Sequence, residues 1–240
     1  MKYVLKEDRF DQRDFKFSRM IAPVAKLKLP KTVDLRTKMP PVYNQGALGS
    51  CTANAGCAYL SYLYKKPFMN FSRLYLYYKE RFLEGTIDTD NGASMRSIAM
   101  AMNKFGVCLE EFMPYIESNF AKTPSDKADK NASKYKIQSY HSLNNLEEIK
   151  QCLALRGHPV LLGMRVYKSF EEEFTAKSGK MKNPSPNDTY LGNHAVLVTG
   201  YTDKNLIVRN SWGEKWGDKG YFYIPYDYFL NYTFNYWTLF

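Results

Sequence analysis

The sequence predicts an α+β protein with two lobes. Helical patterns fill the first half of the chain, whereas short apolar runs separated by glycine, proline and asparagine turns dominate the second half. An order of helices first and strands later is typical of α+β folds. With 240 residues, 45% of them hydrophobic, the chain can bury a large core in one domain or in two small lobes that share a cleft.

Four helices are expected from the spacing of apolar residues and from the residues at the helix ends. Ser72 should cap the second helix, which stops at Gly85, and Gly106 should stop the third. Residues 117–136 are polar, and we interpret them as a linker or surface excursion. The expected helices are Ala53–Tyr64, Arg73–Leu83, Ser94–Phe105 and Leu146–Leu155.

The pattern changes to strands after Pro159. Runs of β-branched and aromatic residues, bounded by turn residues, indicate a β-rich second lobe. The expected strands are Val160–Val166, Ala195–Tyr201, Leu206–Arg209 and Tyr221–Ile224.

Residues 1–28 precede the expected domain as an N-terminal arm. They carry eight Lys/Arg and four Asp/Glu residues, interspersed with apolar side chains such as Phe10 and Phe15. That mixture indicates an extended arm or a short amphipathic helix. The whole chain has a net charge of +10 and some of its basic residues cluster in this arm, but the arm is mixed in sign, so a nucleic-acid partner is not expected.

No segment approaches the roughly 18 apolar residues that cross a bilayer, so no membrane partner is expected. The residues after Met1 also lack the apolar core of a signal peptide.

Cys51 is the strongest candidate for chemistry. It follows a Gly-Ser step at the start of an apolar helical pattern, where the helix dipole favours a thiolate. Gln45 lies six residues earlier and could donate a side-chain N–H to an oxyanion. The cysteines are too few and scattered for a disulfide framework or a zinc site, and whether the other three pair stays open. They are Cys57, Cys108 and Cys152.

Only three histidines could serve Cys51 as a base. His141 and His158 have the surroundings of ordinary loop residues, whereas His194 opens an apolar strand after a glycine turn. Asn210 lies at the end of the next expected strand, Leu206–Arg209, and could fix the His194 tautomer across the sheet. Trp212 could shield that contact from water.

These segments together resemble the papain-like cysteine proteases, the family of papain and the cathepsins. The resemblance covers about residues 29–224 and implies a two-lobed fold with a helical lobe at about 40–115 and a β-barrel-like lobe at about 116–240. A cleft would lie between the lobes of a peptidase domain at 29–240. The matching segments are Leu29-Pro30…Val33-Asp34-Leu35-Arg36, Gln45-Gly46…Gly49-Ser50-Cys51, Asn193-His194-Ala195-Val196 and Asn210-Ser211-Trp212-Gly213.

The resemblance also implies roles. Cys51 would attack the peptide carbonyl to form an acyl-enzyme, with His194 as base and then acid and Asn210 orienting His194. Gln45 and the Cys51 N–H would form the oxyanion hole. No cofactor or metal is implied.

Substrate contacts follow from the same resemblance. Asp90-Asn91-Gly92-Ala93 is similar to the Asn-Gly-Gly segment whose backbone pairs with an extended peptide. We therefore expect Gly92, Ala93, Asn193 and Trp212 to bind substrate, with an apolar residue at P2. The two spare histidines are well separated, which favours an endopeptidase over a carboxydipeptidase.

The chain departs from the family at two places beside Cys51. Leu48 replaces a cysteine that the family uses in a disulfide, and Thr52 replaces a bulky aromatic residue. The lost disulfide favours a bacterial or large-virus enzyme, cytoplasmic or packaged in the virion, over a secreted or lysosomal one.

Two other readings remain open: a catalytically silent binding protein, and a Cys-His acyl transferase or ligase. We expect a monomer that acts on peptides or proteins. The arm at 1–28 is too short for the long inhibitory pro-region of the family, but it could border the cleft and act as a short pro-segment.

Overall fold

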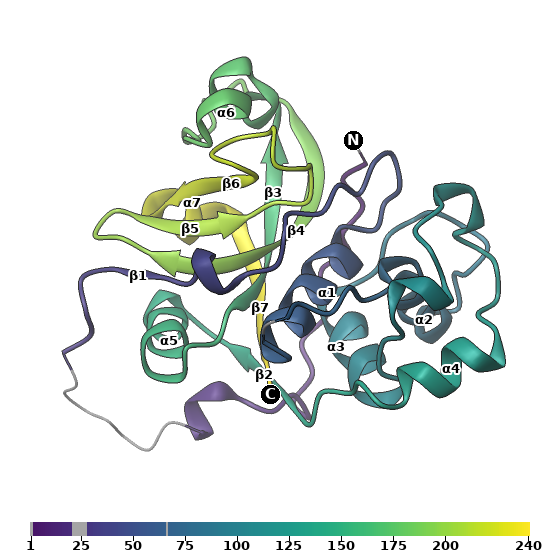
Figure 1. The fold of residues 1–240 in the computed structure, drawn as a ribbon. Coiled ribbons are helices and arrows are strands. Elements are labelled where there is room, and N and C mark those ends of the chain that lie inside the picture. The colour runs from purple at the N-terminus through teal and green to yellow at the C-terminus, as the bar shows by residue number, and fades with distance from the viewer. Residues whose placement is uncertain (1, 21–27, 66) are drawn as a thin grey trace.

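The computed structural model describes residues 2–20, 28–65 and 67–240. Helices α1 to α4 gather on one side of the molecule and an antiparallel sheet forms the other, as Figure 1 shows. Each side has its own cluster of buried apolar side chains. The α+β architecture expected from the sequence is confirmed.

Three of the four helices of the first side lie where the sequence predicted them. Ser72 Oγ accepts the Tyr75 N–H at 3.0 Å, and Ser94 Oγ accepts the Ser97 N–H at 3.2 Å, so both N-caps form. Gly56 lets α3 approach α1, because a Cβ there would lie 2.3 Å from the Ile98 side chain. The helices are α1 (Cys51–Leu63), α2 (Arg73–Glu84), α3 (Met95–Lys104) and α4 (Asp126–Ala132).

Helix α4 lies within the segment that the sequence analysis interpreted as a linker. Ala128 and Ala132, four residues apart, are fully buried and belong to the core cluster of the helical side. The helical side therefore continues past residue 115. Its polar residues hide this helix from a search for apolar periodicity.

The sheet contains all four expected strands and three more. Its order is β2-β7-β3-β4-β5-β6, with β1 paired to β4. Within the described residues the edge strands β2 and β6 do not pair, so the expectation of a barrel-like lobe is corrected to an open sheet. The strands are β1 (Val33–Asp34), β2 (Tyr140–Leu143), β3 (Val160–Tyr167), β4 (Tyr190–Tyr201), β5 (Asn205–Arg209), β6 (Tyr221–Pro225) and β7 (Thr233–Leu239).

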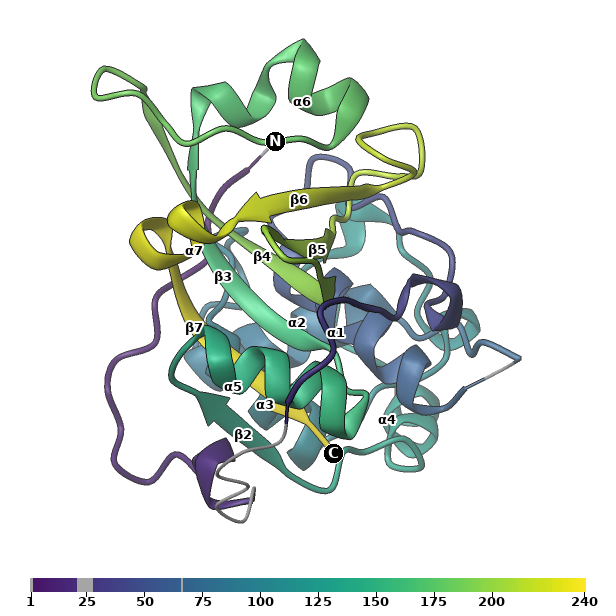
Figure 2. The ribbon, with the colours of Figure 1, turned by 90° about the vertical axis from the view of Figure 1, so that its left-hand side faces the viewer.

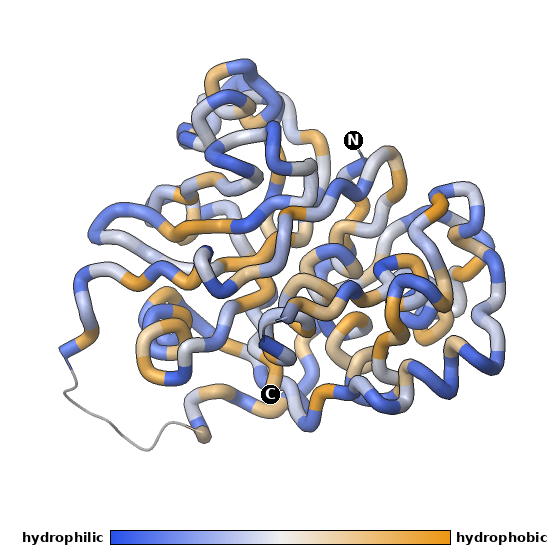
Figure 3. The backbone as a smooth tube through the Cα atoms, viewed as in Figure 1, coloured by the Kyte–Doolittle hydropathy of each residue, from blue (hydrophilic) through white to orange (hydrophobic). Residues whose placement is uncertain are grey.

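Shorter elements cover the sheet. Apolar colours run along its strands in Figure 3, whereas the outer turns around α6 are mostly hydrophilic. The π-helical turn η5 prolongs α5 to Arg156, close to the expected end at Leu155. These elements are η2 (Arg36–Lys38), α5 (Leu146–Gln151), η5 (Cys152–Arg156), η6 (Lys168–Glu171), α6 (Glu173–Ser178) and α7 (Tyr226–Tyr232).

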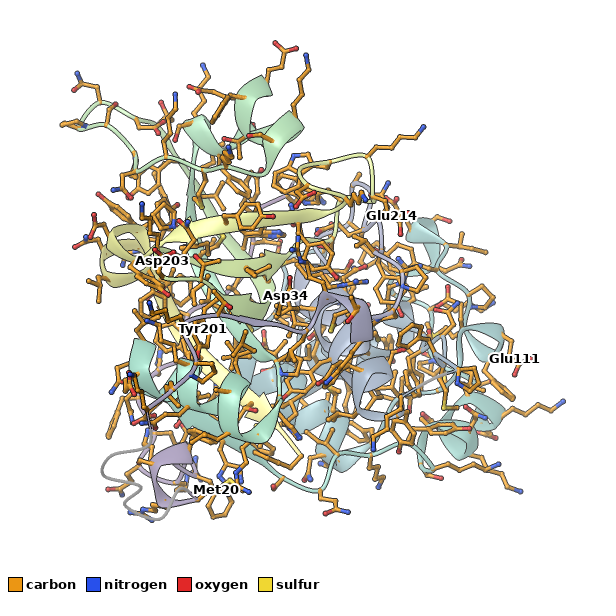
Figure 4. The ribbon with its side chains drawn as sticks, turned by 60° about the vertical axis from the view of Figure 1, so that its left-hand side comes forward. Met20, Asp34, Glu111, Tyr201, Asp203 and Glu214 are labelled. Atoms are coloured by element: carbon orange, nitrogen blue, oxygen red, sulfur yellow. The ribbon has the colours of Figure 1, made fainter. Side chains whose placement is uncertain are left out.

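The N-terminal arm is mainly extended through residue 20, with one short turn, η1 (Phe17–Arg19). Figure 2 shows it descending along the molecule to the neighbourhood of β2, and Met20 marks the end of this described stretch in Figure 4. Phe17 is fully buried in the core of the sheet side. Residues 21–27 of the arm lie outside the described residues. No helix in the described ranges is long and apolar enough to cross a membrane.

Candidate active site

Cys51 is the first residue of α1, at the place where this helix packs against β4. Ser50 occupies the N-cap but makes no side-chain cap bond, so the first amides of α1 depend on other partners. The Cys51 thiol contacts the backbone of Ala195, the residue after His194. Only 1% of Cys51 is exposed.

His194 and Asn210 are joined by one hydrogen bond. The strand pairing of β4 with β5 carries the two side chains to the same end of the sheet, where His194 Nε2 lies 2.9 Å from Asn210 Oδ1. Because an amide oxygen can only accept, Nε2 carries the proton. Nδ1 then has a free lone pair, and it is buried without a hydrogen-bond partner among the described residues. Trp212 covers the imidazole, with ring centres 5.3 Å apart.

Burial disfavours the charged forms of both Cys51 and His194. It raises the pKa of Cys51 to about 12, although the Ala195 backbone favours the thiolate. It lowers the pKa of His194 to about 4, although the bond to Asn210 favours the imidazolium.

Gln45 is completely buried in the loop that leads to Cys51. Its Oε1 accepts the Ser211 hydroxyl at 2.6 Å, and its Nε2 donates to the Leu48 carbonyl at 3.0 Å. An amide nitrogen has two protons, so one remains for a ligand. The Gln45 N–H also donates to Ser211 O at 2.9 Å, which ties the loop to the residue after Asn210.

The segments expected to bind substrate are occupied by the N-terminal arm. The Lys6 N–H donates to Ala93 O at 3.1 Å, and the Leu5 N–H donates to Asn193 O at 3.2 Å. In return, the Asn193 N–H donates to Tyr3 O at 3.2 Å. The arm runs parallel to both partner segments, as the bridges Val4–Asn193 and Lys6–Ser94 show.

Two further contacts complete this coverage. Gly92 has φ +66°, and a Cβ there would lie 2.1 Å from the Val4 carbonyl oxygen, so only glycine allows this approach. The Tyr3 ring lies 5.9 Å from His194 and 6.1 Å from Trp212. All four expected substrate-binding residues therefore contact the arm.

Leu5 fills an apolar pocket beside these segments. It is 4% exposed and packs in a cluster with Ala195 and Leu161. Gly163 leaves room for it, because a Cβ at that position would lie 3.0 Å from Leu5 Cδ2 and 2.7 Å from Phe234 Cε2.

Charged groups hold the arm on both sides. Lys2 pairs with Asp90, Lys6 Nζ lies 2.6 Å from Glu84 Oε2, and the Tyr3 hydroxyl donates to Glu171 Oε1 at 2.6 Å. Asp8 accepts the Trp237 indole N–H at 2.8 Å. The arm thus joins the helical side to the sheet directly across the site.

Comparisons with known proteins identify the family of this chain. The family described as "Papain family cysteine protease" matches residues 29–232. The chain belongs to this papain family. It is therefore a cysteine peptidase, a hydrolase whose substrates are peptides or proteins.

Individual papain-family members show the extent of the likeness. An uncharacterized peptidase C1-like protein of Acanthamoeba polyphaga mimivirus is 35% identical and covers 91% of this chain and 76% of its own length. Chymopapain of Carica papaya is 30% identical, but the chain spans only 58% of its length. The structure of xylellain from Xylella fastidiosa superposes with a TM-score of 0.88 at 34% identity, covering 99% of this chain and 95% of that one.

The two departures from the family pattern have clear structural replacements. Leu48 is 4% exposed and packs in the core of the helical side. The Thr52 hydroxyl donates to Glu80 Oε1 at 2.7 Å, and burial raises the pKa of this fully enclosed carboxyl. All four cysteines of this papain-family chain are free and buried.

Sequence reasoning missed the side chains that fill the site from the arm. Tyr3, Val4 and Leu5 form a short apolar stretch without any distinguishing motif. It also missed Tyr115, whose hydroxyl lies behind the Gln45 loop. The described residues contain no group of three or more metal-ligating side chains.

Proposed function

We propose that this chain is a cysteine endopeptidase that uses Cys51 as nucleophile and His194 as base. One observation carries the proposal: His194 has a buried, unpaired Nδ1 while Asn210 fixes its Nε2, and the Cys51 thiol contacts the backbone of the next residue, Ala195. Nδ1 takes the thiol proton, the thiolate attacks the scissile carbonyl, and the imidazolium returns the proton to the leaving amine. Water, deprotonated by His194, then hydrolyses the acyl-enzyme.

The oxyanion of each tetrahedral intermediate is held by two donors in this proposal. One is the Cys51 backbone N–H at the start of α1, where the helix dipole also favours negative charge. The other is the second proton of Gln45 Nε2, which the bond to Leu48 leaves free.

The Leu5 pocket supports a preference for an apolar residue at P2. It lies between the two backbone segments, at Ala93 and Asn193, that pair with the arm. Gly163, Ala195 and Phe234 give it an apolar wall that accommodates a branched side chain. A leucine-like P2 residue is the best match.

The arm supports a latent form of this peptidase. It fills the substrate-binding segments and leaves 1% of both Cys51 and His194 exposed. A peptide cannot reach the thiol until residues 2–6 leave, so this part of the arm acts as a short pro-segment. The parallel pairing is maintained by ion pairs at its edges.

We also propose a bacterial cytoplasm or a virion as the place of action. The support is that all four cysteines remain free thiols and that two relatives come from a giant virus and a bacterium.

One full-length variant tests these proposals. Leu5→Asp places a charge in the apolar pocket and expels the arm without removing any residue. Phe10→Asp is the matched control, because Phe10 belongs to the same arm but is 88% exposed. We expect Leu5→Asp to react with the epoxide E-64 at least tenfold faster than wild type, by intact mass, and to cleave an unstructured protein, while Phe10→Asp behaves as wild type.

The outcomes separate the alternatives. Labelling that persists in a Leu5→Asp/Cys51→Ala double variant would remove Cys51 as nucleophile. Labelling of Leu5→Asp without hydrolysis would indicate a silent binding protein, and spliced products in the peptide map would indicate acyl transfer. Equal labelling of wild type and Leu5→Asp would exclude the latent form.

A further inference from the structure

Tyr115 links the two ends of the loop that carries the proposed oxyanion donors. Its hydroxyl donates to the Gln45 carbonyl at 2.9 Å and lies 2.5 Å from Ser50 Oγ. Gln45 begins this loop, and Ser50 is the N-cap of α1 immediately before Cys51. One side chain therefore spans the loop from behind.

The direction of these hydrogen bonds follows from the inventory of protons. A tyrosine hydroxyl has one proton, and Tyr115 gives it to the Gln45 carbonyl, so it must accept the proton of Ser50 Oγ. Ser50 Oγ in turn accepts from Asn54 Nδ2 at 3.0 Å. All three bonds point the same way along the chain from Asn54 to Gln45, an arrangement in which each bond polarises and strengthens the next.

The Tyr115 ring is itself fixed. The Arg73 guanidinium lies 3.9 Å from its ring centre, and the Tyr115 N–H donates to Glu110 Oε1 at 2.8 Å. Arg73 also donates to the Asn44 carbonyl at 3.1 Å, just before Gln45. The hydroxyl is thus held in place by contacts that do not involve the cleft.

We propose that Tyr115 is a positioning residue that sets the distance between the Gln45 amide and the Cys51 N–H. This inference rests on the proposed function, because it concerns the oxyanion hole of that reaction. Among the described residues the Tyr115 hydroxyl bonds to Gln45 and Ser50 and not to the thiol or the imidazole, so it acts through those two residues. Loss of its hydroxyl frees the loop ends, and the two donors then no longer converge on one oxygen.

The test is Tyr115→Phe in the full-length Leu5→Asp background, which opens the cleft. The ring, its packing and its contact with Arg73 remain, and only the hydroxyl is lost. We expect kcat to fall on the order of tenfold with KM within about twofold, because oxyanion donors act mainly in the transition state. The affinity for a peptide aldehyde, whose adduct carries an oxyanion-like oxygen, should fall by a similar factor.

Alkylation by iodoacetamide provides the contrasting readout, since it forms no oxyanion and should proceed at the unchanged rate. Tyr75→Phe is the matched control. Its hydroxyl donates to Asp129 of α4 at 2.7 Å and not to the Gln45 loop, so its loss should change none of the three measurements.

Three results would overturn the inference: a kcat like that of the background, equal losses in aldehyde binding and alkylation, or the same losses in Tyr75→Phe. A Leu5→Asp background that labels at Cys51 but neither hydrolyses peptides nor binds the aldehyde would refute the proposed function instead.

Discussion

Lys2 of the arm forms an ion pair with Asp90, and the same carboxylate accepts the N–H of Gly49 just before the Cys51 helix. Asp90 Oδ1 serves Gly49 at 3.0 Å and the Tyr77 hydroxyl at 2.6 Å, while Oδ2 serves Lys2. A single carboxylate therefore binds both the loop that leads to Cys51 and the N-terminal arm that lies over the site. Glu84 repeats the second function with Lys6.

Salt should release the arm. Half of the Lys2 side chain is exposed, so its pair and that of Lys6 contribute about 0.5 kcal/mol each and are screened by added salt. Raising sodium chloride from 0.05 to 0.5 M should speed Cys51 labelling of wild type roughly fivefold. Asp90→Asn keeps an acceptor for Gly49 but loses the charge. Its Cys51 should therefore be labelled faster than that of wild type at low salt, and added salt should increase that rate less. If salt increased the labelling rate of the opened Leu5→Asp variant as much as that of wild type, this explanation would be wrong.

Acid should also favour the open form. The covered His194 has a pKa lowered to about 4 by burial, and with the arm away it returns toward its ordinary value of about 6.5. Between these values the open form binds a proton and the covered form does not, so the open fraction rises as pH falls through this window. Between pH 7 and pH 5 the ratio of open to covered protein should rise on the order of tenfold.

The measurement is the ratio of labelling rates of wild type and Leu5→Asp at each pH, which cancels the intrinsic pH dependence of the thiol. Asp8→Asn is a necessary control, because burial raises the pKa of this arm carboxyl and its protonation favours the covered form. A ratio that stays constant from pH 7 to pH 5 would refute the prediction.

Asn210→Ala should damage turnover more than binding. It leaves the buried His194 Nε2 without its acceptor, a loss of about 1–3 kcal/mol. In the Leu5→Asp background, kcat should fall roughly 5- to 150-fold while KM changes little. Initial rates across substrate concentrations test this, and a selective rise in KM would argue that Asn210 binds substrate instead.

Phe234→Ala should change selectivity in the Leu5 pocket. Phe234 forms a wall next to the Leu5 side chain, so its removal creates space that a larger residue can fill. The ratio of kcat/KM for P2 phenylalanine over P2 leucine should rise about tenfold in peptide pairs that differ only at P2. Phe82→Ala, at a 53% exposed position on α2, should leave the ratio unchanged. A constant ratio in Phe234→Ala would place P2 elsewhere.

Two phenylalanines of the arm, Phe17 and Phe15, should differ in their effect on stability. Phe17 is fully buried, so Phe17→Ala should lower the free energy of unfolding by about 3–5 kcal/mol. Phe15→Ala, at a 62% exposed position, should change it by less than about 0.5 kcal/mol. Urea denaturation measures both. Deletion of residues 1–28 would therefore confound uncovering of the site with loss of core packing.

The sequence was most informative where local chemistry repeats a known pattern. The cap Ser72 was predictable because a serine hydroxyl placed before a helix accepts one of the unpaired N–H groups of the first turn. The closeness of His194 and Asn210 was predictable because two antiparallel strands joined by a short turn fix which residues face one another. In both cases the partners lie near each other along the chain or within a family motif.

Contacts between distant segments could not be predicted in this way. The pairing of Leu5 with Asn193 depends on two short backbone stretches and leaves no periodic signal. The only apolar side chains that helix α4 buries are two alanines, and β7 pairs with β2 and β3 through an aromatic run that also suits a surface. The sheet is open because β2 and β6, at its two edges, do not pair with each other among the described residues. The sequence of a single strand does not show which partner it lacks.

The place of β7 has a consequence for biosynthesis. This strand lies between β2 and β3, yet it follows both of them along the chain. During translation residues 2–6 are synthesised before His194 and long before β7. Residues 2–6 are thus already available to occupy the site when the sheet is completed. The newly made peptidase can therefore fold without passing through a complete state whose Cys51 is accessible.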